Sequence, residues 1–331
     1  MQHSRRTFVK MSGSVAVYAE MAGPLFAAMR PPIDTLKIIC GYPAGSPPDM
    51  VARQVGERMV GSYAKSVIVD NRTGAAGRIA VDALKTAPPD GSVMLLTPAS
   101  VMTMYPHIYR QLSYNPLVDF AAVSVASDFS HAVAVGPMVP ESVRTAREFL
   151  SWCRTNSQKA TCGNPGAGSL PHFIAVLFER EGGVSLQHAP YRGTGPAVQD
   201  LLGGHIAAAV GPEGNFMPYT ESGKLRVIAM TDGKRSRFLP LVPTFAEQGF
   251  NTIRVREWFG FFMPGSAPND VVEEASAAVR HALSQKDVSV SFQKLGMETA
   301  YSSPAELTAK VKSEIEYWGP IIKPTGFTAE S

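Results

Sequence analysis

The sequence predicts an α/β fold made of two lobes with a ligand cleft between them. Short apolar runs rich in β-branched residues alternate with glycine- or proline-containing turns and helical runs, which is typical of βαβ units around a parallel sheet. This pattern occurs in two series, one starting at Leu36 and one after residue 130. Two long segments, 120–137 and 254–264, connect the series, so we expect the chain to cross twice between the lobes.

The first series contains three strand-like runs and two helical runs. The strand-like runs are LKIIC (36–40), SVIVDN (66–71) and SVMLL (92–96), and the helical runs are MVARQVGERMV (50–60) and RIAVDALKTA (78–87). Each of the first two strand-like runs leads through a turn into one of these helical runs, and the third ends in another turn and a helix-like stretch, so we expect the strands to be parallel.

The second series repeats this order and is followed by a helical tail. Its strand-like runs are ATCGN (160–164), LQHAP (186–190), HIAAAVG (205–211) and LRVIAM (225–230), and helical runs include 147–154 and 173–182. In the tail, apolar residues recur at helical spacing, as in Leu307, Val311, Ile315 and Trp318.

The composition is that of a globular protein without a nucleic-acid partner. The chain has 331 residues, of which 45% are hydrophobic, and a formal net charge of +3. The excess positive charge lies in the first 30 residues, and the remainder has no basic stripe of the kind that binds nucleic acid. The histidines and cysteines show no metal-ligand spacing, so we expect no metal and no cofactor.

The N-terminus is similar to a twin-arginine export signal. Ser4-Arg5-Arg6-Thr7-Phe8-Val9-Lys10 precedes a weakly apolar run that is too short and polar to span a membrane. Glu20 within this run and the poor cleavage site Phe26-Ala27-Ala28 leave a second interpretation open, a basic N-terminal tail. We predict a signal peptide over 1–30 and a soluble protein in the periplasm.

Three cysteines allow at most one disulfide within the chain. Cys153 lies in a helical run and Cys162 at the end of the next strand, so a bridge between them is one interpretation and two free thiols the other. Cys40, in the first strand, is expected to be a core residue.

Two glycine-rich loops follow strands, and each begins a helix. They are GYPAGSPPD (41–49) and GNPGAGSLPH (163–172). The second is no phosphate loop, because Gly168 stands where a lysine is needed, and no dinucleotide loop, because Pro171 replaces the last glycine. Helix N-termini attract anions, so two such loops across a cleft are expected to clamp one small anion.

The roles of individual loop residues have alternatives. Ser169 either caps its helix or donates its hydroxyl to the ligand, and Asp49 either supports its own helix or contacts the ligand, with the structural role favoured. His172 lies three residues after Ser169, which raises the possibility of a Ser/His hydrolase. That hypothesis lacks an orienting carboxylate and a G-x-S-x-G elbow, so we expect no catalysis.

The ordered set of motifs resembles the substrate-binding receptors of tripartite tricarboxylate transporters, often called Bug receptors. The resemblance covers about Leu36 to Pro320. It is carried by GYPAGSPPDMVAR (41–53), VDNRTGAAGRIAVDAL (69–84), APPDGSVMLLTPAS (87–100), LSYNPLVDFAAVSVAS (112–127), GNPGAGSLPHF (163–173), APYRGTGPAVQDLLGGHI (189–206) and SGKLRVIAMTDGKRSRFLPLVPTFAEQGF (222–250).

This resemblance implies a type II periplasmic-binding-protein (Venus-flytrap) architecture that closes on a small organic carboxylate without catalysis. The implied lobes are 36–128 with 256–331, and 129–255. The implied ligand-binding residues are Tyr42, Ala44, Ser46, Thr97, Ser100, Asn164, Gly168, Ser169, His172 and Glu213, and Asp49 of the first loop is a further candidate. The implied partners are the permease subunits of a tripartite transporter, with the receptor itself a monomer.

Several residues depart from the family pattern. Ser46 and Pro48 replace a glycine and a threonine in the first loop, and Asn164 replaces a serine. Glu213 would repel a second ligand carboxylate, so a neutral or amino far end is favoured. A periplasmic sensor that feeds a signalling partner is the alternative function. An effector-sensing lobe pair of a transcription regulator is a second hypothesis. It requires an N-terminal helix-turn-helix, for which residues 1–35 are too short, so we do not expect it.

Overall fold

The strands of the described residues form one mixed sheet. The computed structural model describes residues 31–329, and the predicted signal peptide lies outside them. The strand order is β2-β1-β3-β9-β4-β7-β5-β6, with β10 and β8 paired to β4. The strands are β1 (Ile33–Cys40), β2 (Ala64–Asn71), β3 (Val93–Pro98), β4 (Phe120–Val135), β5 (Thr161–Asn164), β6 (Gln187–Pro190), β7 (Ala208–Pro212), β8 (Arg226–Met230), β9 (Arg256–Pro264) and β10 (Glu298–Thr299).

The parallel pairing predicted within each series is confirmed for β1, β2 and β3 and for β5, β6 and β7, but not for β8, which is antiparallel to β4. In the first series β1 lies between β2 and β3 and is parallel to both. In the second series β5 lies between β6 and β7, again parallel to both. The carboxyl ends of parallel strands meet at one edge of a sheet, so the loops that follow β1 and β3 are neighbours, as are those that follow β5 and β6.

The two predicted connections are themselves strands. β4 is antiparallel to β9 up to Ser130, and from His131 onward it pairs with β7 and β8 instead. Almost every residue of β4 and β9 is buried, so neither strand shows the alternation of apolar and polar residues that marks a half-exposed strand. Pro32–Ser331 form a single compact unit, and the lobe boundaries at 128/129 and 255/256 stay a prediction.

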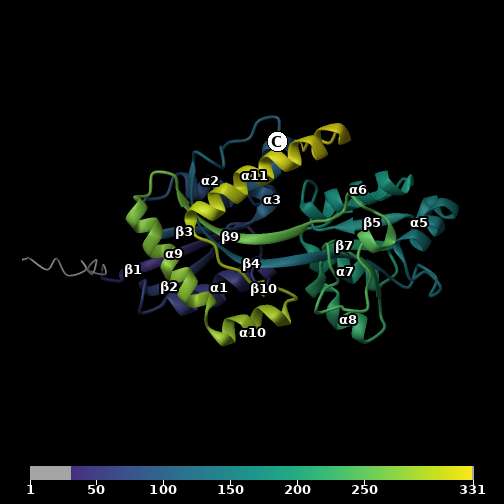
Figure 1. Cartoon of the computed structure of the whole chain (residues 1–331), viewed down its shortest axis with the longest axis horizontal. Coiled ribbons are helices and arrows are strands. Elements are labelled where there is room, and N and C mark those ends of the chain that lie inside the picture. The colour runs from purple at the N-terminus through teal and green to yellow at the C-terminus, as the bar shows by residue number, and fades with distance from the viewer. Residues whose placement is uncertain (1–30, 330–331) are drawn as a thin grey trace, which may run out of the picture. The chain divides into compact units, whose positions relative to one another are not determined.

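Helices cover both faces of the β4–β9 region (Figure 1). α1, α9 and α10 supply one buried cluster with Phe129 and Phe259, whereas α2, α3 and α11 supply another with Trp258 and Phe262. The helices are α1 (Pro47–Met59), α2 (Arg78–Lys85), α3 (Ala99–Thr103), α4 (Tyr105–Ile108), α5 (Ala146–Thr155), α6 (Leu170–Gly182), α7 (Thr194–Leu202), α8 (Met217–Glu221), α9 (Asn269–Leu283), α10 (Lys286–Lys294) and α11 (Pro304–Ile322).

All three cysteines are free and buried. The bridge between Cys153 and Cys162 that the sequence left open is therefore not formed. Burial raises the pKa of the Cys162 thiol to about 12, with Cys153 adding to the effect, so both thiols are core groups. Cys40 has no exposed surface, which confirms its predicted core role.

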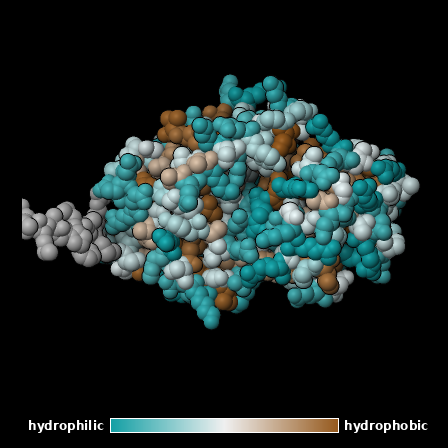
Figure 2. Space-filling model, viewed as in Figure 1, coloured by the Kyte–Doolittle hydropathy of each residue, from teal (hydrophilic) through white to brown (hydrophobic). Residues whose placement is uncertain are grey.

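The surface is mainly hydrophilic on the face shown in Figure 2, where brown hydrophobic residues are scattered among teal ones. Leu241 and Val118 are among the most exposed large apolar side chains. Among the described residues, no helix has the length and apolar character needed to cross a bilayer.

A turn with left-handed backbone joins β2 to α2. Ala75 and Ala76 have φ of 44° and 53°, although neither is glycine, and Gly77 follows with φ of 92°. The Tyr105 hydroxyl donates to the Ala76 carbonyl oxygen at 2.9 Å and helps to hold this turn. A left-handed alanine costs about 1–2 kcal/mol.

Replacing Ala76 by glycine is expected to raise the free energy of unfolding by about 1 kcal/mol, because glycine adopts this backbone without strain. Chemical denaturation measures the change. Ala83→Gly, in the middle of α2, is the control and should lower stability by about 1 kcal/mol. Equal losses in both variants would show that the turn is unstrained.

Candidate functional site

The first loop, between β1 and α1, is closed by bonds among its own residues. The N–H and the hydroxyl of Ser46 both donate to the Pro43 carbonyl oxygen, at 3.1 and 2.5 Å. Gly45 has a left-handed φ of 78°, and its N–H donates to Oδ2 of Asp49 at 2.8 Å. Ala44 is exposed at the tip. The hydroxyl hydrogen of Ser46 is thus used within the loop.

The buried carboxylate of Asp49 holds this loop in shape through hydrogen bonds. It is 1% exposed, and besides Gly45 it accepts from Nδ2 of Asn71 at 2.8 Å and from Nε of Arg53 at 2.9 Å. Burial raises its pKa, but the hydrogen bonds from Arg53, Gly45 and Asn71 outweigh burial and hold the pKa below its usual value. These contacts favour the structural interpretation of Asp49 over a ligand contact.

The second loop, between β5 and α6, is closed in the same manner. The N–H and the hydroxyl of Ser169 donate to the Gly166 carbonyl oxygen, at 3.2 and 2.6 Å. Gly168 has φ of 82°, and its N–H donates to Nδ1 of His172 at 3.2 Å. The N–H of His172 in turn donates to Oγ of Ser169 at 3.4 Å, so Ser169 is the N-cap of α6.

The two loops are structural equivalents of each other. In each, a left-handed glycine precedes an N-cap serine, and the side chain three residues after the serine accepts the glycine N–H. They differ in charge, because this side chain is the carboxylate Asp49 in one loop and the imidazole of His172 in the other. The first turn of α6 contains no acidic residue. Its positive dipole end is therefore uncompensated and suits an anion.

Ser169 and His172 do not form a nucleophile and base. The Ser169 hydroxyl points to Gly166, and Nδ1 of His172 is occupied by the Gly168 N–H. Burial, with His188 as the second cause, lowers the pKa of His172 to about 4. The hydrolase hypothesis has no support in this geometry.

Asn164 places an unused donor at the second loop. It ends β5, has no exposed surface, and accepts the Gly166 N–H through Oδ1 at 3.1 Å. Its Nδ2 is buried and has no hydrogen-bond partner among the described residues. A buried amide without an acceptor costs stability, so this donor indicates a site for an anionic or carbonyl oxygen.

A third loop, which the sequence did not single out as a site, supports the second. After β6, the N–H of Tyr191 donates to the Asn164 carbonyl oxygen at 2.8 Å and that of Gly193 to Pro165 at 3.1 Å. The Tyr191 hydroxyl donates to Asp200 at 2.7 Å. In the sequence, Tyr191 and Gly193 shortly after the β6 strand are the signal that could have pointed to this loop.

Tyr42, Thr97 and Ser100 lie together at the carboxyl ends of β1 and β3. Cys40 and Leu96 are paired in these strands, so the residues that follow them are neighbours. Thr97 and Ser100 are buried, and Tyr42 is half-buried. Burial raises the pKa of Tyr42 well above its usual value, and the nearby Tyr105 and Glu257 add to this shift.

Glu213 lies in a buried network rather than on an open surface. It is 2% exposed and accepts the Ser236 hydroxyl. Burial raises its pKa to about 7, against the effect of the Ser236 hydrogen bond and of Arg256. Arg256, at the start of β9, also pairs with Asp128 at 2.5 Å and with Asp232. Glu213 is therefore near the point where β4 and β9 leave one group of strands for the other.

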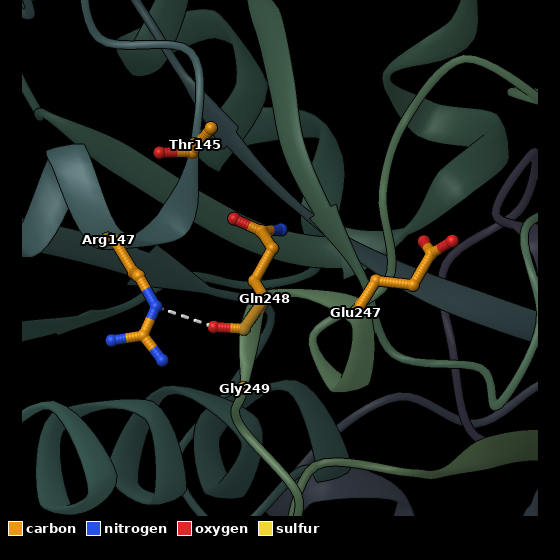
Figure 3. Close-up of a pocket in the computed structure, with 5 residues that line it drawn as sticks. All are labelled: Thr145, Arg147, Glu247, Gln248 and Gly249. Atoms are coloured by element: carbon orange, nitrogen blue, oxygen red, sulfur yellow. Dashed lines mark hydrogen bonds between the residues drawn. The ribbon is translucent and has the colours of Figure 1, made fainter.

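Two cavities contain none of the predicted site residues. One, of about 410 Å³, is lined by Thr145, Arg147, Glu247, Gln248 and Gly249, with Arg147 donating to the Gln248 carbonyl oxygen at 2.7 Å (Figure 3). The other, of about 280 Å³, is lined by His107, Gly319, Lys323, Gly326, Phe327 and Thr328. Only the second touches the loops described above, through Phe327, which contacts His172.

The buried His172 predicts a pH-dependent stability. Its folded pKa of about 4 lies below the ordinary 6.5, so the neutral ring contributes stability that is present above pH 6.5 and is lost as pH falls toward 4. His172→Gln removes this titration. The wild type should lose about 2 kcal/mol more than the variant between pH 7 and pH 5, measured by urea unfolding.

Glu213 provides the control of opposite sign. Its folded pKa of about 7 lies above the ordinary value, so its protonated form contributes stability that is fully present below pH 4.5 and is lost as pH rises through 7. Glu213→Gln removes this loss, so the stability of the variant relative to the wild type should increase as pH rises from 4.5 to 7. Parallel pH profiles for wild type and His172→Gln would contradict the buried, neutral state of His172.

Comparison with known proteins supports the architecture. The structure is similar to that of the periplasmic binding protein BugD, with a TM-score of 0.83 and 28% identity over 90% of this chain and 100% of that one. It is also similar to MatC from Rhodopseudomonas palustris with bound malate, with a TM-score of 0.81 and 26% identity over 88% and 99% of the two chains. The predicted two-lobed periplasmic-binding-protein fold is thereby confirmed.

Sequence comparison gives the family. BugT of Bordetella pertussis is 27% identical over 93% of this chain and 94% of its own length, and a protein of Pseudomonas sp. strain P51 is 30% identical over 85% and 83%. The family model described as "Tripartite tricarboxylate transporter family receptor" matches residues 51–327. The chain therefore belongs to the tripartite tricarboxylate transporter receptor family, whose members are substrate-binding receptors and not enzymes.

Proposed function

We propose that the protein is a receptor for a small organic acid and that the second loop binds the acid's carboxylate. The observation that carries this proposal is Nδ2 of Asn164, a buried donor without a described partner beside a helix whose first turn has no acidic residue. A carboxylate oxygen would accept from Nδ2 and lie at the positive end of the α6 dipole.

Relatives support this class of ligand. MatC was solved with malate, and another R. palustris protein, 26% identical with a TM-score of 0.83, was solved with adipate. In the proposed site the remaining contacts come from Tyr42, Ala44, Ser46, Thr97 and Ser100. The lobes 36–128 with 256–331, and 129–255, would close on the ligand, because contacts from both favour the closed state.

Isothermal titration with mono- and dicarboxylates and amino acids tests the proposal. Asn164→Ala should weaken the binding of any ligand found by about tenfold or more, since a hydrogen bond to a charged group is lost. Asn251→Ala, at an exposed position, is the matched control and should leave the affinity unchanged. A folded protein that binds no member of the panel would count against the proposed function.

The location and partners are further parts of the proposal. The family is one of receptors for tripartite transporters, so the loaded protein would act as a monomer that delivers its ligand to membrane permease subunits. Residues 1–30, with Arg5 and Arg6, would direct it to the periplasm through the twin-arginine route. Replacing both arginines by lysine should abolish export, as measured by cell fractionation.

A further inference from the structure

The segment that follows α11 returns to the second loop. The short 3-10 turn Lys323–Thr325 ends the helix, and the Ala329 N–H then donates to the Ile108 carbonyl oxygen of α4 at 3.1 Å. Between Thr325 and Ala329 lies Phe327. The centre of its ring is 4.8 Å from that of the His172 ring and 5.5 Å from that of the Phe173 ring, and both are edge contacts. An aromatic side chain that is remote in sequence thus packs on the first turn of α6.

The packing also reaches the glycine of the loop. A side-chain carbon on Gly168 would lie 3.5 Å from Ile108 and 3.8 Å from Phe327. The N–H of this glycine donates to Nδ1 of His172, and this bond requires that the ring keep its orientation and stay neutral. Phe327 covers the ring, and His188, 5.1 Å away and bonded to Glu179, lies in edge contact with it.

We propose that Phe327 is a positioning residue for the second loop. By packing on the His172 ring it holds Nδ1 toward Gly168, and thereby holds the backbone of the loop in its present shape. The part of the proposal that concerns the ligand rests on the proposed function: this shape is the one that presents Asn164 and the N-terminus of α6 to the carboxylate.

Phe327 lies just beyond the end of α11, so the contacts of this helix show which elements Phe327 links to the second loop. α11 packs on α3 and α4, which follow β3 of the first series, and on β4, which runs through both groups of strands, whereas the second loop follows β5. Phe327 therefore connects the second loop to elements beside β3. Removal of water from His172 by this ring is also part of the burial that lowers the pKa of His172.

Phe327→Ala tests the proposal with two measurements. The pKa of His172, followed by NMR of the ring protons and assigned with His172→Gln, should rise by one unit or more toward 6.5. The dissociation constant of the ligand found by titration should increase about tenfold. Phe327→Tyr keeps an aromatic ring at this place and should restore both values.

Tyr317→Ala is the control, because Tyr317 lies half-exposed on α11 and makes its edge contact with Trp318 instead. It should change neither value. An unchanged pKa of His172 in Phe327→Ala would overturn the positioning role, and tighter binding in this variant would show that the ring occupies the place of the ligand. If the wild type binds no carboxylate, the proposed function fails, while the pKa measurement still decides the role of Phe327.

Discussion

Asp49→Ala is expected to lower the free energy of unfolding by about 2 kcal/mol and to weaken ligand binding. The buried carboxylate joins the Gly45 N–H, the Asn71 amide and the Arg53 guanidinium. Its loss leaves the Gly45 N–H without this acceptor and leaves Nδ2 of Asn71 with only its second acceptor, the Tyr42 carbonyl oxygen. Because Arg53 is half-exposed and can regain water, the cost falls below that of a fully buried ion pair. Chemical denaturation and titration calorimetry measure the two effects.

Asp34→Ala is the matched control for this variant. Asp34 also forms an ion pair, with Lys65 at 2.7 Å, but both side chains are largely exposed. Its removal should leave the free energy of unfolding close to that of the wild type, because water screens an exposed ion pair. Equal effects of the two substitutions would show that Asp49 does not organise the first loop.

The loops themselves could be found from sequence because their signals are local. A strand-like run, a glycine, a serine and a proline in this order predict a strand, a turn and a capped helix, and both loops have that form. The partners of Asp49 and His172 could not be predicted from local sequence signals. Asn71 comes from β2 and Phe327 from beyond α11, and no local pattern shows that these residues meet the loops.

The β4 and β9 strands illustrate a different limit. Their residues are buried on both faces, so the 3.6- and 2-residue periodicities that separate helix from strand are absent. The sequence therefore showed that these segments cross between two series, but not that they pair with each other. Glu213 was singled out for its place after β7, and its partners Ser236 and Arg256 became visible only in the fold.

Gly214→Ala is expected to lower the free energy of unfolding by about 3 kcal/mol. Gly214 follows β7, and a side-chain carbon here would lie 1.8 Å from the Leu295 carbonyl oxygen and 3.0 Å from the Gly296 nitrogen. Both are backbone atoms of the segment between α10 and β10, so no side-chain rotation relieves the overlap, and the two segments must separate.

That separation would also disturb the network around Glu213, the preceding residue, because β10 carries Glu298, which pairs with Arg256 at 3.4 Å. Gly233→Ala is the control: this glycine is exposed and has no heavy atom near the added carbon, so its melting temperature should match that of the wild type. Equal melting temperatures for the two variants would mean that the 213–215 turn does not rest on Leu295 in solution. A selective loss in Gly214→Ala would instead identify this backbone contact as the one that keeps the β7 loop against the α10–β10 segment.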